Sequence, residues 1–198
     1  EQFIQRYREI SALKTEVLVL VDTKHAALFK RLKDNSSRGR IVEKVKDSGA
    51  AVFVLGESDA SAYSVSASNS IEDLPLFNVA GMLPGKSKEK ELVLISAHYD
   101  HLGILKSVEG DSIANGADDD ASGIGALISF AEYFQNNPPK HSVVLAAFDA
   151  EELGLEGSKY FVNNSIVSLN KIMLNLNMDM ISRSETNTLF AVGTRFNN

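Results

Sequence analysis

The sequence predicts an α/β protein with a mostly parallel mixed sheet that helices flank. Two observations lead to this prediction. Residues 92–97, 143–148 and 172–180 form short, largely apolar runs, and residues 121–134 between them carry apolar side chains at helical spacing. Strands that are apolar along their length are typical of sheets buried on both faces, and helices that alternate with such strands are typical of parallel pairing.

The sequence pattern of the first part of the chain predicts a small α/β unit. Residues 1–13 place apolar side chains at helical spacing, and residues 16–21 form an apolar run of strand length. A second helix is expected at 41–47, because Gly49 follows it and glycine commonly lies just beyond a helix end. A second strand is expected at 50–55.

Polar stretches indicate where loops and a domain boundary lie. Residues 34–40 are expected to form a polar loop. Residues 58–70 hold six serines and read as a linker, and Pro75 follows shortly after. We therefore expect one unit at 1–75 and a second unit at 76–198.

The second unit holds the segments on which the predicted sheet depends. In chain order, the sequence predicts a strand at 92–97, a polar loop at 107–120, a helix at 121–134, a strand at 143–148, a helix at 158–163, and strands at 172–180 and 189–192. Pro138 and Pro139 follow the first of these helices, and proline cannot continue a helix.

Composition excludes several classes of protein. The 198 residues carry 20 basic and 26 acidic side chains, a net charge of −6, so there is no basic excess to attract nucleic acid. No apolar run approaches the roughly 18 residues of a membrane-spanning helix. The chain has no cysteine, which excludes disulfides, thiolate metal sites and cysteine nucleophiles.

Acidic and histidine side chains occur where the predicted strands end. They are His98, Asp100 and His101 after the first strand, the aspartates 118–120 before the helix, Asp149, Glu151 and Glu152 after the next strand, and Asp179 near the end of the run at 172–180. Any one of these acids is more typical of a solvated loop or a helix cap. Together they predict a divalent-cation site, because ligands bind beyond the carboxyl ends of such strands and clustered carboxylates repel one another. Nitrogen and oxygen ligands suit zinc, manganese or cobalt.

Four short motifs occur in order along the second unit. They are His98-Tyr99-Asp100, residues 116–123 with three consecutive aspartates, residues 150–158 with two adjacent glutamates, and residues 177–180 around Asp179. Together they resemble the two-zinc exopeptidase family that includes bacterial leucyl aminopeptidase and aminopeptidase Y. The resemblance implies an enzyme that hydrolyses N-terminal residues from peptides with two zinc ions per complete catalytic domain.

The same resemblance implies a role for each motif residue. His98 and Asp179 would bind one zinc ion, Glu152 would bind the second, and Asp119 would bridge both ions. Glu151 would be the general base, which takes a proton from a zinc-activated water and returns it to the leaving amine.

The resemblance also implies features around these ligands. Asp100 would hydrogen-bond the far ring nitrogen of His98 and fix the ring, and the peptide bond after Asp119 would be cis. The family carries a further histidine for the second zinc near the end of its catalytic domain, whereas no histidine follows Asp179 here. The chain is therefore interpreted as lacking that end, with His101 or a partner chain as alternative donors.

Several alternatives stay open at this point. A single-zinc glutaminyl cyclase, a carboxypeptidase and a non-catalytic peptide-binding scaffold are compatible with the same architecture. Residues 39–54 resemble the helix and strand of a protease-associated domain, which would make the first unit an insert of that kind. The habit of the family indicates a secreted or periplasmic protein, and nothing in the sequence assigns an oligomeric state.

Overall fold

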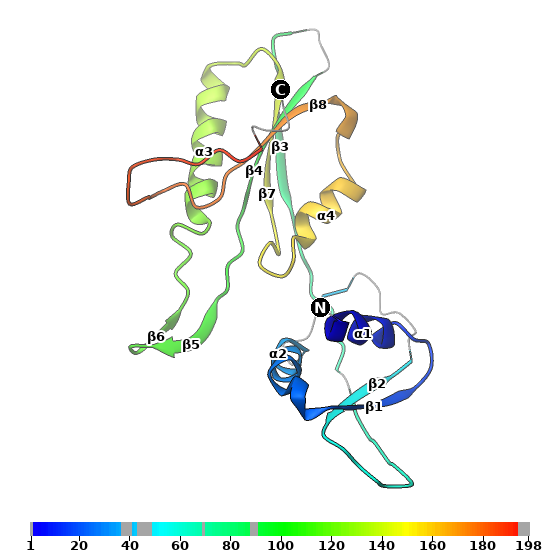
Figure 1. The fold of residues 1–198 in the computed structure, drawn as a ribbon. Helices are drawn as coiled ribbons and strands as arrows, with labels where there is room; N and C mark the ends of the chain where they lie inside the picture. The colour runs from blue at the N-terminus through cyan, green and yellow to red at the C-terminus, as the bar shows by residue number, and fades with distance from the viewer. Residues whose placement is uncertain (1, 37–40, 43–48, 69, 88–90, 194–198) are drawn as a thin grey trace. The chain divides into compact units, whose positions relative to one another are not determined.

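The computed structural model describes residues 2–36, 41–42, 49–68, 70–87 and 91–193. The chain divides into two compact units, Glu1–Glu72 and Asp73–Asn198 (Figure 1). We call them the N-terminal unit and the C-terminal unit and consider each by itself.

The N-terminal unit pairs two short parallel strands beside two helices. Its elements are α1 (Gln2–Ser11), β1 (Val17–Val21), a 3₁₀ turn (Thr23–His25), α2 (Ala26–Ser36) and β2 (Ala51–Leu55). Val17 lies opposite Ala51 in the parallel ladder, and the ring of Tyr7 on α1 packs on Phe53 of β2 at 4.9 Å between centroids.

Of two expectations for this unit, one is wrong in part and the other falls mostly outside the described residues. The polar loop expected from residue 34 is wrong at its start, because α2 continues to Ser36. Lys30 and Asp34 lie one helical turn apart and form an ion pair of 2.6 Å, which favours the extra turn. The helix expected at 41–47 lies mostly outside the described residues.

The C-terminal unit is built on a four-stranded sheet in the order β3-β7-β4-β8. The strands are β3 (Val79–Leu83), β4 (Leu92–His98), β7 (Ser142–Phe148) and β8 (Ile172–Asn177). The strand β4 runs parallel to both β7 and β8, and only β3 is antiparallel to its neighbour. This confirms the predicted mostly parallel mixed sheet.

Helices cover both faces of this sheet. Figure 1 shows α3 (Ala121–Asn136) on one side and α4 (Glu156–Asn163) on the other. Successive side chains of a strand point to opposite faces, so β4 and β7 contribute to two cores. The core that includes Phe161 of α4 consists of Leu92, Leu94, Val144, Ala146, Phe148 and Phe161. The core that includes Leu127 of α3 consists of Ile95, Ala97, Leu127, Val143 and Met178.

Three short strands were not predicted from the sequence. One is β3, an exposed edge strand. The others are β5 (Ile104–Val108) and β6 (Asp111–Ile113), which form a hairpin across the start of the expected polar loop. Both residues of its turn, Glu109 and Gly110, have positive φ angles, as tight hairpin turns with the favoured twist require.

The strand expected at 189–192 is wrong. These residues have no regular secondary structure, and Val192 is 98% exposed. A strand needs a neighbouring strand for its backbone hydrogen bonds, and an apolar run without one gives no ladder. Among the described residues, no helix has the length and apolar content needed to cross a membrane.

Removing the Phe161 side chain should destabilise the C-terminal unit. Phe161 is 5% exposed and meets the ring of Phe148 edge-on at 5.5 Å. We expect Phe161→Ala to lower the free energy of unfolding by about 3–5 kcal/mol, since it leaves a cavity in the core. Hydrogen exchange of β4 and β7 amides measures this unit alone. The control is Tyr160→Ala, at a side chain 62% exposed, and equal losses in the two variants would contradict the described core.

Candidate metal centre

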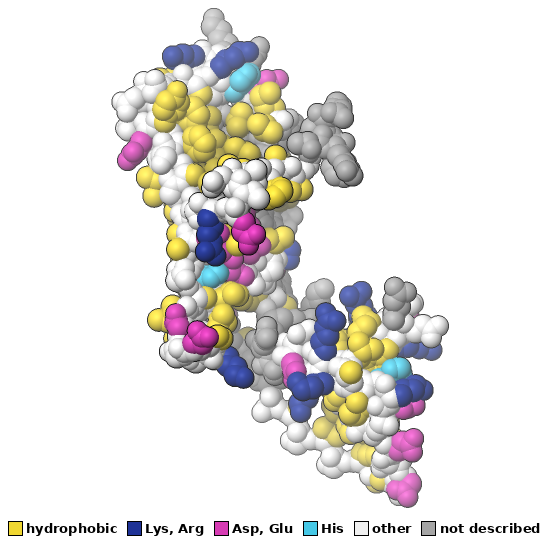
Figure 2. Space-filling view, turned by 60° about the vertical axis from the view of Figure 1, so that its left-hand side comes forward, with side chains coloured by type: hydrophobic (Ala, Val, Ile, Leu, Met, Phe, Trp, Pro, Cys, Tyr) yellow, Lys and Arg dark blue, Asp and Glu magenta, His cyan; other side chains and the backbone are white. Residues whose placement is uncertain are grey.

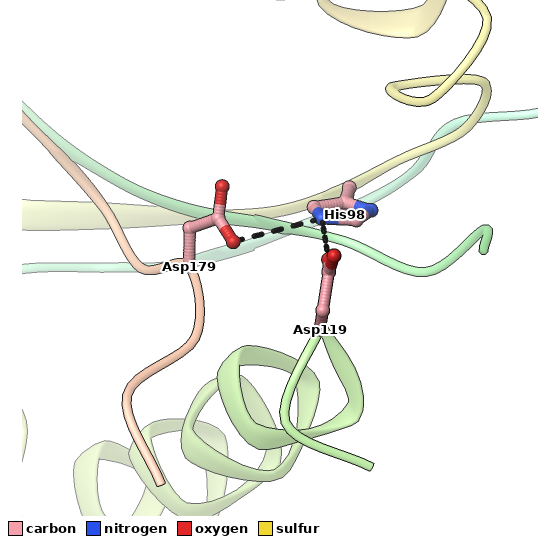
Figure 3. Close-up of side chains that lie close together, drawn as sticks. All are labelled: His98, Asp119 and Asp179. Atoms are coloured by element: carbon pink, nitrogen blue, oxygen red, sulfur yellow. Dashed lines mark ion pairs between the residues drawn. The ribbon is translucent and has the colours of Figure 1, made fainter. Parts of the chain in front are cut away.

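Three of the predicted site residues converge at one edge of the sheet. His98 is the last residue of β4, Asp119 lies just before α3, and Asp179 lies just beyond β8. The Nε2 atom of His98 lies 3.0 Å from Asp119 Oδ1 and 3.8 Å from Asp179 Oδ1 (Figure 3). The three atoms lie close enough together to hold one metal ion.

A second group of residues lies next to the first and shares Asp119 with it. His101 Nδ1 lies 2.9 Å from Glu152 Oε1 and 3.8 Å from Asp119 Oδ2. These three atoms could also hold a metal ion. The two oxygens of Asp119 therefore face different groups, which is the arrangement a bridging carboxylate needs. The sequence named His101 only as an alternative donor, and the fold brings it to Glu152.

Glu151 lies beside the first group and belongs to neither set of ligand atoms. It lines a cavity of about 230 Å³ together with His98 and Asp179. Burial raises the pKa of the Glu151 carboxyl, and the carboxylates of Glu152 and Asp179 add to the rise. A carboxylate with a raised pKa is a better proton acceptor than an ordinary surface glutamate.

Asp120 connects the three chain segments that carry the first group. Its buried carboxylate accepts hydrogen bonds from the backbone N–H groups of His98, Gly123 and Met180, at 3.1–3.2 Å. Burial raises the pKa of Asp120, and these three donors oppose the rise. A side chain at Gly123 would place its Cβ 2.5 Å from Asp120 Oδ2, so glycine is needed there. The peptide bond between Asp119 and Asp120 is cis, which confirms that prediction.

Asp100 orients three of the predicted residues. Its backbone oxygen lies 3.0 Å from His98 Nδ1, while its carboxylate is 3.5 Å from the same nitrogen. The carboxylate instead accepts hydrogen bonds from the backbone N–H groups of Glu151 and Glu152, at 2.9 and 3.1 Å. The contact with His98 was expected, whereas the contacts with the two glutamates depend on the turn after β7 and had no signal in the sequence.

The carboxylates that face the site have no lysine or arginine partner among the described side chains. Within the part of the chain that the structure describes, Asp119, Glu152 and Asp179 form ion pairs with histidine alone. Arg183 pairs with Asp118 at 3.6 Å. Several carboxylates held this close repel one another unless a cation lies between them. The donor atoms, histidine nitrogen and carboxylate oxygen, fit zinc.

Comparison with known proteins agrees with this assignment of a metal site. Residues 78–198 match the family described as Peptidase family M28. Aminopeptidase YwaD of Bacillus subtilis is 31% identical over 109 residues, which cover 54% of this chain and 22% of that protein. A probable zinc metalloprotease of Leptosphaeria maculans is 29% identical, with 54% of this chain and 25% of that protein covered. A vacuolar membrane protease of Kluyveromyces lactis is 25% identical, with 78% and 16% covered. The chain spans a quarter or less of the length of these curated relatives.

Solved structures with some likeness to the chain include two bacterial proteins. A zinc aminopeptidase from Bacillus subtilis has a TM-score of 0.40 and 29% identity, covering 52% of this chain and 24% of that one. A glutaminyl cyclase from Bacteroides thetaiotaomicron, bound to N-acetylhistamine, has a TM-score of 0.45 and 24% identity, covering 52% and 41%.

Replacing Asp120 should loosen the three segments that it connects. Asp120→Ala leaves three backbone donors without their acceptor, and we expect a loss of at least about 3 kcal/mol, since a hydrogen bond to a charged group contributes about 1.5–3 kcal/mol. Amide exchange at His98, Gly123 and Met180 should accelerate together. Asp111→Ala, which removes one exposed acceptor in the hairpin, should leave these amides unchanged. Independent exchange at the three positions in Asp120→Ala would contradict the role of this carboxylate.

Proposed function

Because the chain belongs to peptidase family M28, we propose that its C-terminal unit is the catalytic part of a zinc-dependent exopeptidase that removes N-terminal residues from peptides. The observation that carries the proposal is the position of Asp119, whose two oxygens face two separate groups of ligand atoms. Relatives named as an aminopeptidase and as a zinc metalloprotease support it.

The proposed ligands divide between two zinc ions. His98, Asp119 and Asp179 would hold the first ion, and Asp119 and Glu152 would contribute to the second. Zinc bonds of about 2.0–2.2 Å in tetrahedral geometry place neighbouring ligand atoms about 3.3–3.6 Å apart. The separations of 3.0 and 3.8 Å around His98 Nε2 are near that value. When bound, zinc supplies a polarised substrate carbonyl and an acidified water.

Glu151 is the proposed general base. Its carboxylate would accept a proton from the attacking water and later donate it to the amine of the shortened peptide, which leaves when the peptide bond breaks. Asp100 keeps the backbone of Glu151 and Glu152 in place through two hydrogen bonds, so that one carboxylate lines the cavity while its neighbour faces His101. The backbone oxygen of Asp100 lies beside Nδ1 of His98. The other ring nitrogen, Nε2, is therefore available to bind the metal.

The alternatives differ in the number of metal ions and in turnover. A single-zinc glutaminyl cyclase or carboxypeptidase would need only one group of ligands, and a binding scaffold would retain peptide without cleaving it. The shared Asp119 favours the two-zinc reading. The secreted or periplasmic location and the protease-associated identity of the N-terminal unit stay predictions of the resemblance.

Replacing Glu151 should separate chemistry from metal binding. We expect the chain to release the N-terminal residue from an unblocked peptide and not from the same peptide acetylated at its N-terminus. Glu151→Gln should lower this rate by about 10²–10⁴-fold, since it removes a general base, and should leave the zinc content unchanged. Glu132→Gln on α3 is the control. Full turnover by Glu151→Gln would refute the assignment of the base.

Replacing Asp119 should affect both zinc ions at once. Elemental analysis should find about two zinc ions per wild-type chain, at most one in Asp179→Ala and none tightly bound in Asp119→Ala, because Asp119 is the residue that the two groups share. The control Asp111→Ala should keep both ions. A single ion in the wild-type chain would contradict the two-zinc proposal and favour the single-zinc alternative.

A further inference from the structure

We propose that Asn78 is a positioning residue for the general base Glu151. The inference rests on the proposed function and deepens it, because it names a residue on which the placement of the base depends. Asn78 lies just before β3, far from Glu151 in the sequence, and belongs to none of the four motifs. We call Phe77 and Asn78 the entry segment, since they lead the chain into β3.

The turn between β7 and α4 carries Glu151 and is closed at its two ends by backbone hydrogen bonds. Gly157 N–H donates to the backbone oxygen of Asp149 at 2.9 Å, and Glu156 N–H donates to that of Ala150 at 3.0 Å. Glu151 lies within the loop that these two bonds close. The direction of its side chain therefore depends on how the ends of the loop are held.

The side chain of Asn78 bonds to both ends of this loop. Its Oδ1 accepts from Asp149 N–H at 3.1 Å, just after β7, and its Nδ2 donates to the backbone oxygen of Gly157 at 2.8 Å, in the first turn of α4. The fit is close, because a Cβ added to Gly157 would lie 2.4 Å from Asn78 Oδ1. One side-chain amide, which offers both an acceptor and a donor, thus fixes the end of the strand against the start of the helix.

The backbone of Phe77 joins the entry segment to the loops after both β4 and β7. Phe77 N–H donates to Asp149 Oδ2 at 2.9 Å, and the backbone oxygen of Phe77 accepts from the hydroxyl of Tyr99. Tyr99 directly follows the proposed ligand His98. Figure 1 shows the chain that leads into β3 passing beside the turn between β7 and α4. The entry segment therefore braces the loop after His98 against the loop that carries Glu151.

The turn needs such a brace because it holds two residues in the left-handed region. Ala150 has a φ angle of +53° and Leu155 one of +65°, a conformation that is costly for residues other than glycine. Backbone of this kind persists where the surrounding contacts over-determine it. Ala150 N–H donates to Asp149 Oδ1 at 2.8 Å, and Asn78 holds the two ends of the loop. Since Ala150 directly precedes Glu151, relaxation at Ala150 would redirect the carboxylate of the base.

The polar groups of the brace are engaged by backbone, unlike those that face the site. Figure 2 shows a histidine and acidic side chains exposed together on the C-terminal unit, where a peptide can reach them. Asp149 lines the same cavity as Glu151, but both of its carboxylate oxygens accept from backbone N–H groups. The amide of Asn78 is likewise paired at both ends. Asn78 and Asp149 therefore act on the reaction through the position of Glu151.

A competing role for Asn78 is to anchor the edge strand β3 without affecting the base. Val79, the next residue, pairs with Ala147 of β7, so a change at Asn78 could act on β3 alone. The N–H groups of Glu151 and Glu152 donate to Asp100 and would not respond in that case. The two roles therefore differ in what Asn78→Ala does to these two amides.

The first measurement is hydrogen exchange on the 198-residue chain. In Asn78→Ala, we expect exchange at the Glu151 and Glu152 amides to accelerate by at least about tenfold, the factor expected from two lost hydrogen bonds, with the β4 amides unchanged. Asn78→Asp keeps the acceptor and loses the donor, so its acceleration should be smaller, and it decides the test if Asn78→Ala does not fold. The control is Val79→Ala, at a side chain 65% exposed, which should leave both amides unchanged.

The second measurement is turnover, with enough zinc to saturate both proposed sites. Asn78→Ala should lower kcat by about 10–100-fold and leave KM unchanged, because a displaced base slows the chemical step without weakening substrate binding. In the Glu151→Gln background, the same change should lower kcat by less than about threefold, since the group through which Asn78 acts is already gone. A purely structural role of Asn78 would give the same fall in both backgrounds.

The outcomes separate this inference from the proposed function. Unchanged exchange at Glu151 and Glu152 in both Asn78 variants overturns the inference in favour of the strand-anchoring role. An equal fall of kcat in the two backgrounds also overturns it, because Asn78 would then act on something other than the base. A wild-type chain that cleaves no unblocked peptide refutes the proposed function. Accelerated exchange would in that case still support the hold of Asn78 on the turn, and unchanged exchange would overturn it.

Discussion

The metal centre depends on one buried carboxylate that binds no metal in our proposal. Asp120 accepts backbone hydrogen bonds from the end of β4, the first turn of α3 and the segment beyond β8. Each first-group ligand is one of these bonded residues or its immediate neighbour: His98 donates to Asp120, Asp119 precedes it, and Asp179 precedes the donor Met180. Burying a carboxylate is costly unless hydrogen bonds compensate for lost hydration, and here the compensation also fixes the spacing of the three ligands.

A second aspartate, Asp100, also fixes backbone segments through hydrogen bonds to its oxygens. Asp100 holds the backbone of Glu151 and Glu152 through its carboxylate and faces His98 Nδ1 through its carbonyl oxygen. The acidic residues thus divide into those that hold the backbone and those whose charge faces the site. Only the second kind needs a cation to offset its negative charge. The histidines cannot supply positive charge while they are neutral.

The sequence predicted the parts of the fold that follow from local pattern, but not those that depend on tertiary contacts. The strands β4 and β7 were predicted because both faces are buried and their runs are apolar. The hairpin β5–β6 was missed because its side chains are largely exposed, and residues 189–192 were wrongly expected to form a strand because apolar content alone does not provide a partner. His98, Asp119, Glu152 and Asp179 were named from motifs. The contacts of Asp100 with the backbone of Glu151 and Glu152, and of Asp120 with the backbone of His98 and Met180, could not be named, since they depend on where distant N–H groups point.

The three consecutive aspartates show why a helix cap and a metal ligand are not competing interpretations. Asp120 caps α3 by accepting from Gly123 N–H, Asp119 faces both histidines, and Asp118 accepts from the backbone and hydroxyl of Ser182 at 3.1 and 2.6 Å. Ser122 adds a bond from Ile181 N–H at 3.0 Å. The segment that carries Asp179 is therefore tied to the start of α3, although Asp179 follows a sheet strand in the chain. Met178 N–H also donates to the backbone oxygen of Ser96 on β4 at 2.8 Å, so the position of Asp179 depends both on the sheet and on the start of α3. A change at the start of α3 therefore reaches every ligand of the first group.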